Sequence, residues 1–107
     1  MKALIVIDML NDFVTGALAN EADAMKIVPV IKRLIDHARR QPDWPVVYAN
    51  DAHRADDREI SIWGKHAMAG TSGANVIEAL APIGAERELF CPSDFMGLSM
   101  EPIWKRF

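Results

Sequence analysis

The chain has 107 residues, of which 50% are hydrophobic and 25% are charged, and its formal net charge at pH 7 is -3. A chain of this length has room for one hydrophobic core and therefore for one domain. The charge balance gives no reason to expect nucleic acid or an acidic membrane surface as a partner. No stretch approaches the roughly 18 consecutive apolar residues that span a bilayer. The single cysteine, Cys91, excludes an internal disulfide and favours a reducing compartment, so we expect a cytoplasmic protein.

Three short apolar segments have the composition of buried parallel strands. Residues 3–7 are apolar without alternation, and residues 45–49 repeat this pattern. Continuous apolar runs of this kind suit strands that are covered on both faces. Residues 88–90 form a shorter and weaker segment, which is typical of an edge strand.

Helices are expected between these strands. Apolar residues recur at three- and four-residue steps from Ile27 to Ala38, which predicts an amphipathic helix. Because proline is tolerated only in a first turn, Pro29 places the start of this helix near Val28, after a connecting loop over residues 15–23. Two further helices are expected, over residues 74–80 and 99–107.

The alternation of strand and helix predicts an α/β fold with right-handed crossovers. We expect a three-layer, doubly wound (Rossmann-like) parallel sheet, truncated to about three β-α units. The apolar face of the last expected helix runs to Phe107 without a cap, so the chain is expected to be incomplete at its C-terminus. Neither a Gly-x-Gly-x-x-Gly sequence after the first strand nor a phosphate-binding Gly-Lys-Ser/Thr loop is present, which argues against a nucleotide-binding enzyme.

Polar residues follow each expected strand, at the edge where parallel α/β sheets bind their ligands. Asp8 follows the first strand, Asp51 and His53 follow the second, and the turn from Cys91 follows the third. Convergence from separate strands is better evidence for a site than any one residue. Asp8 considered alone has an equally good reading as a turn or helix-capping aspartate.

The Asp-x-His pair at Asp51 and His53 has the composition of half a metal site, because carboxylate and imidazole are ordinary ligands. Glu59 or His66 could supply a further ligand from the following loop. On spacing alone, ordinary polar loop histidines remain the alternative. Cys91 is interpreted as an incidental thiol, since no basic residue or helix N-terminus lies near it in sequence to favour the thiolate.

These segments resemble the isochorismatase-like cysteine hydrolases, a family that includes the nicotinamidases. The resemblance is carried, in the same order and spacing, by Ala3-Leu-Ile-Val-Ile-Asp-Met-Leu-Asn-Asp-Phe-Val14, Ile27-Val-Pro-x-Ile-x-x-Leu34, Pro45-Val-Val-Tyr-x-Asn-Asp-x-His53, Trp63-Gly-x-His-Ala67 and Gly70-Thr-x-Gly-Ala74. It covers nearly all of the chain and is specific for the family but not for a substrate. It implies a single isochorismatase-like domain over residues 1–107, incomplete at the C-terminus, and hydrolysis of an amide C–N bond in a small molecule.

The resemblance also implies roles for particular residues. The family uses an Asp, Lys and Cys triad, in which the cysteine attacks a carbonyl and the aspartate acts as its general base. Asp8 matches this aspartate, and Phe13 and Trp63 match the aromatic residues that sandwich a flat substrate in nicotinamidases. The positions of the nicotinamidase metal site, which would hold a divalent metal such as zinc or iron, are matched by Asp51, His53, Glu59 and His66.

Two triad positions depart from the family pattern. Leu89 stands where the lysine is expected, and the nucleophilic cysteine belongs to a unit downstream of position 107. The resemblance therefore implies a truncated chain that is inactive alone. The alternative is a non-catalytic binding or homo-oligomerisation module, because the strand at residues 3–7, central in the family's sheet, would have an unpaired apolar edge.

Overall fold

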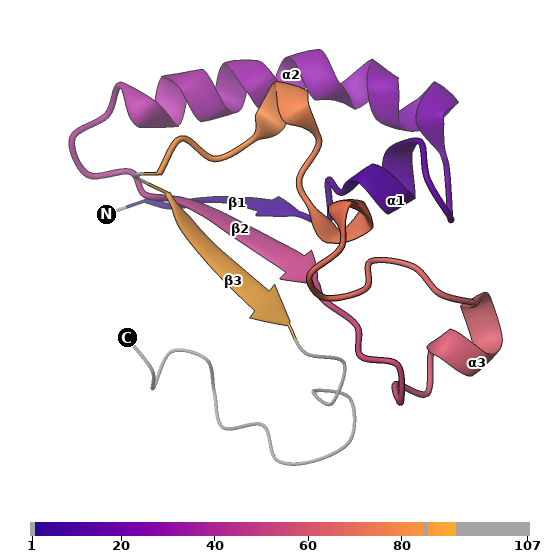
Figure 1. Cartoon of the computed structure of the whole chain (residues 1–107). Helices are drawn as coiled ribbons and strands as arrows, with labels where there is room; N and C mark the ends of the chain where they lie inside the picture. The colour runs from indigo at the N-terminus through magenta and orange to yellow at the C-terminus, as the bar shows by residue number, and fades with distance from the viewer. Residues whose placement is uncertain (1, 85, 92–107) are drawn as a thin grey trace.

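The computed structural model of the chain describes residues 2–84 and 86–91. Three strands, β1 (Leu4–Ile7), β2 (Val46–Asp51) and β3 (Arg87–Cys91), form a parallel sheet in the order β1-β2-β3 (Figure 1). The predicted parallel α/β sheet is thus confirmed. The helix expected over residues 99–107 lies outside the described residues.

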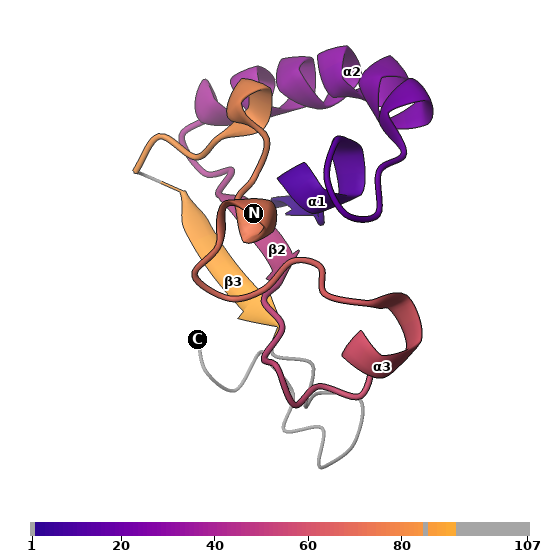
Figure 2. The same cartoon turned by 45° about the vertical axis from the view of Figure 1, so that its right-hand side comes forward.

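The long helix α2 (Glu21–Arg39) covers one face of this sheet, and Figures 1 and 2 both show it lying across the strands on one side. Its buried residues Val28, Ile35 and Ala38 join a core that includes Val6 of β1 and Val46 of β2. Periodic burial of one helix face against a sheet is the main source of its stability. Among the described residues, no helix is long and apolar enough to cross a membrane.

The opposite face of β1 is open in the described part of the chain. Ile5 and Ile7 are 56% and 64% exposed, whereas Val6 between them is 4% exposed. Side chains of a strand alternate between the two faces of a sheet, so these isoleucines share the face away from α2. The expectation of strands covered on both faces is therefore not met by β1 within residues 2–84 and 86–91.

Helix α2 begins earlier than predicted, at Glu21 instead of near Val28, and Pro29 lies within it. A proline inside a helix removes a hydrogen bond and costs about 3 kcal/mol. Its burial against the sheet offsets this cost, and Glu21 and Asp23 place negative charge in the first turn, where the helix dipole favours it. The predicted loop over residues 15–23 is correspondingly shorter.

The prediction of a helix over residues 74–80 is also wrong. Two short 3-10 turns, η1 (Ser72–Ala74) and η2 (Glu78–Leu80), flank an extended segment. In this segment Val76 forms an antiparallel bridge with Leu10, and the N–H of Ile77 donates to the carbonyl of Met9 at 2.9 Å. These tertiary hydrogen bonds use backbone groups that a helix would have paired internally.

Two other short helices position loops around the carboxyl end of the sheet. Helix α1 (Asn11–Val14) follows β1 almost directly, and the sequence pattern did not indicate it. Helix α3 (Ile60–Trp63) lies beyond the arrowhead of β2, on the side away from α2, in both Figures 1 and 2. The segments that carry the candidate site residues therefore gather at one end of the strands.

Candidate metal and acid site

Asp8 is the first residue after β1, and it leaves the strand with φ 52°. This left-handed conformation is unusual for a residue other than glycine, although Asp and Asn tolerate it best. Its Oδ1 accepts a hydrogen bond from the backbone N–H of Asp51 at 2.9 Å. Burial raises the pKa of the Asp8 carboxyl, and the negative charge of Asp51 adds to this, while the hydrogen bond from the Asp51 N–H and any positive charge on His53 act in the opposite direction.

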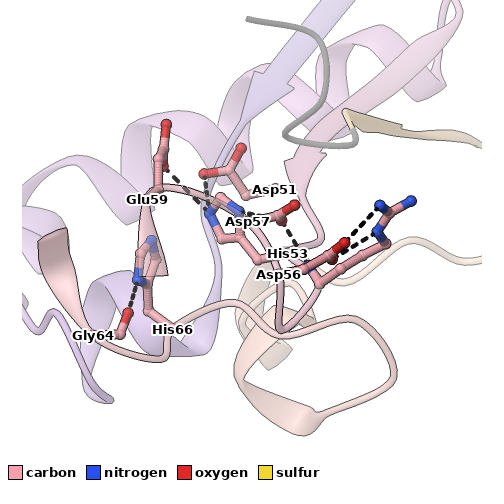
Figure 3. Close-up of polar contacts among 8 residues, drawn as sticks. Asp51, His53, Asp56, Asp57, Glu59, Gly64 and His66 are labelled. Carbon is pink, nitrogen blue, oxygen red and sulfur yellow. Dashed lines mark hydrogen bonds and ion pairs between the residues drawn. The ribbon is translucent and has the colours of Figure 1, made fainter. Parts of the chain in front are cut away.

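His53 lies two residues beyond the end of β2 and is 2% exposed. Its Nδ1 is 3.2 Å from Oδ2 of Asp57, which also accepts a hydrogen bond from the backbone N–H of Arg54 at 2.7 Å (Figure 3). Its Nε2 lies 3.5 Å from Oδ2 of Asp51 and 3.6 Å from Oε2 of Glu59. Because a carboxylate only accepts, the contact with Asp57 places a proton on Nδ1, and in the neutral imidazole the lone pair is then on Nε2.

The Nε2 atom of His53 is buried and makes no hydrogen bond with the described residues. An unpaired buried nitrogen that faces two carboxylates is costly unless something occupies the space between them. A ligating histidine that is held by a carboxylate at its other nitrogen is a recurrent feature of metal sites. The position of Asp57 behind His53 therefore fits a bound cation.

His66 approaches His53 from the loop after α3. It is 3% exposed, and the ring centroids of the two histidines are 4.6 Å apart. Its Nδ1 is 2.7 Å from the carbonyl oxygen of Gly64 (Figure 3), so the proton belongs on Nδ1 and Nε2 is left as a ligand atom. In both residues the contact at Nδ1 favours the neutral tautomer whose Nε2 is available to bind a metal.

The group formed by His53, Glu59 and His66 could hold a metal ion. One ligand atom from each residue lies within 4.8 Å of the others. Zinc takes nitrogen and oxygen ligands at about 2.0–2.2 Å, so a small inward movement of these side chains would close the site. Asp51 adjoins the group through its contact with His53 and is half-buried.

The two expected aromatic residues lie in different environments. Phe13, from α1, is half-buried, with its ring centroid 5.8 Å from that of His66. Trp63, the last residue of α3, is 64% exposed. The described chain therefore brings Phe13 to the histidine pair and leaves Trp63 at the surface.

The backbone of β3 places Leu89 and Cys91 by register. Leu89 lies opposite Ala49, and Cys91, the last residue of β3, lies opposite Asp51. Cys91 therefore belongs to the strand itself, not to a turn after it as the sequence suggested. Arg87 lies opposite Val47, at the start of the strand and away from the edge where Asp8 lies.

Sequence reasoning missed two acidic residues of this region. Asp57 holds Nδ1 of His53, and Asp12 accepts a hydrogen bond from the backbone N–H of Ala67 at 2.9 Å. The contact of Asp57 could have been predicted from the sequence, because an acid four residues after a histidine in a turn is within reach of the imidazole ring. The contact of Asp12 could not, since its hydrogen bond comes from a residue 55 positions away in the sequence.

The fold and the site define an α/β protein with a half-buried acid and a candidate metal group at the carboxyl edge of a parallel sheet. The isochorismatase domain matches residues 2–89, so the chain belongs to the isochorismatase family and the resemblance in the motifs is confirmed. A curated relative, an uncharacterized isochorismatase family protein of Bacillus subtilis, is 34% identical over 97 residues, which are 85% of this chain and 50% of the relative.

The comparison with solved structures agrees with this family assignment. N-carbamoylsarcosine amidase from Thermoplasma acidophilum is 43% identical, with a TM-score of 0.76 over 84% of this chain and 51% of that one. Pyrazinamidase of Pyrococcus horikoshii, solved in complex with zinc, is 26% identical, with a TM-score of 0.73 over 85% of this chain and 51% of that one. The chain thus spans about half the length of the relatives it matches.

Proposed function

We propose that the chain carries the general-base and metal-binding part of an isochorismatase-type site that hydrolyses the amide C–N bond of a small molecule. The link through Asp51 is the main support: its N–H donates to Asp8 at 2.9 Å, and its carboxylate lies 3.5 Å from His53 Nε2. Asp51 thereby couples the half-buried acid Asp8 to the candidate metal group. Solved relatives that are named amidase, pyrazinamidase and nicotinamidase support an amide substrate.

Asp8 is the proposed general base. Its Oδ1 is occupied by the Asp51 N–H, which leaves Oδ2 to accept a proton. Burial raises the pKa of the carboxyl, and a base whose pKa approaches the working pH transfers protons more effectively. Phe13 would provide an apolar wall for a flat substrate beside His66, and Trp63 would complete the sandwich when a ligand is present.

The proposed ligands of a divalent metal, zinc or iron, are His53, Glu59 and His66, with Asp51 beside them. The unpaired Nε2 of His53 and the engaged Nδ1 atoms of both histidines fit such an ion. When bound, the ion would offer a Lewis-acid position to a substrate nitrogen or oxygen. Zinc is present in the pyrazinamidase structure that this chain resembles.

The 107-residue chain is not expected to turn over substrate through a thiol. Leu89 occupies the position of the family's lysine, and the resemblance places the family's cysteine after position 107. Loss of a nucleophile costs orders of magnitude in rate. We propose a cytoplasmic location for the protein, because the single cysteine of the chain favours a reducing compartment.

Titration calorimetry of the zinc-loaded chain with N-carbamoylsarcosine, nicotinamide and pyrazinamide tests this proposal. We expect at least one of these compounds to bind to the chain and to bind more weakly to the Phe13→Ala variant. No ammonia should be released. The control is His37→Gln, which should leave binding unchanged. His37 is exposed on α2, and its ring contacts Trp44. Failure of all three to bind, or ammonia release that alkylation of Cys91 abolishes, would contradict the proposal.

A second candidate function is homo-oligomerisation through the free edge of β1. The N–H groups of Leu4 and Asp8 donate to β2, so those of Ile5 and Ile7 point to the other edge. Antiparallel pairing of two copies about Val6 would set Ile5 opposite Ile7 of the second copy and satisfy these groups. In the three-layer doubly wound arrangement that the family resemblance implies, further strands and helices would cover this edge and face.

Sedimentation equilibrium of the chain and of Ile7→Lys tests the second candidate. We expect a dimer for the unaltered chain and a monomer for the variant, because a lysine on an edge strand opposes pairing. Ile62→Lys is the matched control, since Ile62 and Ile7 are both 64% exposed and Ile62 lies on α3. A monomeric unaltered chain, or a dimer that Ile7→Lys leaves intact, would exclude this mode of assembly.

A further inference from the structure

Asp12 connects three segments of the chain, one of which carries His66 of the candidate metal group. It lies in α1, and its Oδ2 accepts a hydrogen bond from the backbone N–H of Ala67 at 2.9 Å. Its Oδ1 accepts one from the backbone N–H of Ala17 at 3.2 Å. Both carboxylate oxygens are therefore engaged by backbone donors, one of them in the loop that carries His66.

The surroundings of Asp12 are shaped to admit its carboxylate. A Cβ atom at Gly73 would overlap Oδ2 of Asp12, and a Cβ atom at Gly16 would overlap Oδ1. Two glycines, Gly16 after α1 and Gly73 in η1, thus leave room for one side chain. Such close approach indicates that the position of the Asp12 carboxylate is fixed from several sides.

Ala67, the residue that Asp12 binds, is itself unusual. It follows His66 directly, is fully buried, and has φ 43°. An alanine in this left-handed region costs roughly 1–2 kcal/mol, so it persists only where its surroundings hold it there. The carbonyl of Ala67 accepts the backbone N–H of His53 at 2.8 Å, while its N–H donates to Asp12. The residue next to one histidine is therefore bonded to the backbone of the other.

We infer that Asp12 is a positioning residue that sets the separation of His53 and His66 by fixing the backbone of Ala67. The inference rests on the proposed metal-binding function. Without the bond from Ala67, the strained backbone after His66 would relax, and the 4.6 Å spacing of the two rings would be lost. Asp12 touches neither a metal nor a substrate in this role and acts through the loop alone.

Asp12→Asn in the 107-residue chain is the test, with cobalt(II) as the probe. The N–H groups of Ala17 and Ala67 each need an acceptor oxygen, and asparagine offers only one. One hydrogen bond is therefore lost, and the side-chain NH₂ group faces one of the two N–H donors. We expect the dissociation constant for cobalt(II), followed by its visible absorption, to rise about 10- to 100-fold, as for other residues that orient metal ligands. The absorption bands should also shift, because the ligand geometry changes.

Two further variants separate positioning from a loss of folding. Asp23→Asn is the matched control, since the Asp23 side chain is 68% exposed on α2, and it should leave cobalt binding unchanged. Asp12→Asn combined with Ala67→Gly should fold well, because glycine tolerates φ 43°. Its cobalt affinity should nevertheless stay low, whereas recovery to the unaltered value would show that Asp12 serves only to offset backbone strain.

The remaining outcomes distinguish this inference from the proposed function. Unchanged cobalt affinity and spectrum in folded Asp12→Asn would overturn the positioning role and leave the metal site standing. If the unaltered chain binds no cobalt, the metal proposal fails, and the amide exchange rate of Ala67 and the ¹⁵N shifts of the His66 ring decide the role of Asp12. We expect both to change in Asp12→Asn, and unchanged values would overturn the inference by themselves.

Discussion

The backbone N–H of Asp51 donates to the carboxylate of Asp8 at 2.9 Å, across the carboxyl ends of β1 and β2. The regular pairing of the two strands ends at Ile7 and Ala49, which lie one residue before Asp8 and two residues before Asp51. The side chain of Asp8 thus continues the link between the strands beyond their last paired residues. The acid and the segment that leads to His53 are held in one arrangement by this bond.

Asparagine should replace Asp8 without loss of stability, whereas alanine should not. Asparagine keeps an acceptor oxygen for the Asp51 N–H, tolerates φ 52° and carries no charge to bury. Alanine loses the acceptor and is strained in this conformation, so we expect Asp8→Ala to lower the free energy of unfolding by about 1–2 kcal/mol. Urea unfolding at pH 7 measures both, and equal stability of the two variants would contradict this account of Asp8.

Zinc should stabilise the chain through His53 and His66. A ligand that binds only the folded state at 100 times its dissociation constant adds about 2.7 kcal/mol to the free energy of unfolding. We expect this gain to disappear in His53→Gln and in the presence of a chelator, and to persist in His37→Gln, where the exposed histidine of α2 is altered. Thermal unfolding with and without zinc is the measurement. Equal responses of the two variants would show that zinc binds elsewhere.

The strands were predictable because continuous apolar runs leave few alternatives. The helices were less so, since α2 continues through Pro29 on account of burial that only the assembled sheet provides. A helix was expected over residues 74–80, but Val76 bridges Leu10 and residues 75–77 are extended. In both cases tertiary contacts outweighed the local preference.

The candidate site was predictable to the extent that its residues follow strand ends. Asp8 comes directly after β1 and His53 two residues after β2, and parallel topology brings such positions together. The partner of His53 Nδ1, Asp57, depends on the path of a loop, and Asp12 depends on a contact 55 residues distant. Neither relationship follows from composition or periodicity.

Gly73→Ala should destabilise the chain only while Asp12 is present. The new Cβ atom would overlap the Asp12 carboxylate and displace it from the N–H of Ala67. We expect a loss of about 1–3 kcal/mol in the unaltered background, as for other overpacked sites. In an Asp12→Ala background the added loss should be much smaller. A double-mutant cycle by urea unfolding measures this coupling, and additive losses would exclude the steric explanation.

Arg39 and Glu86 form an ion pair between α2 and the start of β3 whose contribution should depend on pH. The Glu86 side chain is 4% exposed, and it also accepts the backbone N–H of Ile83 at 2.7 Å. Burial alone would raise the pKa of Glu86, but the Ile83 N–H and the Arg39 guanidinium outweigh it and hold the pKa below its ordinary value of 4.5.

Glu86→Gln should therefore lower the free energy of unfolding by about 1–2 kcal/mol at neutral pH. At this pH the carboxylate is charged and accepts hydrogen bonds from Arg39 and from the backbone N–H of Ile83. Since the pKa is lower in the folded state than in the unfolded one, this stabilisation is present above pH 4.5 and is lost as the pH falls through the folded value. The stability difference between the unaltered chain and Glu86→Gln should shrink over this range in urea unfolding. Glu78→Gln, at an exposed position of η2, is the control and should show no such difference. A difference for Glu86→Gln that stays constant down to acid pH would show that packing, and not the charge of Glu86, joins these two segments.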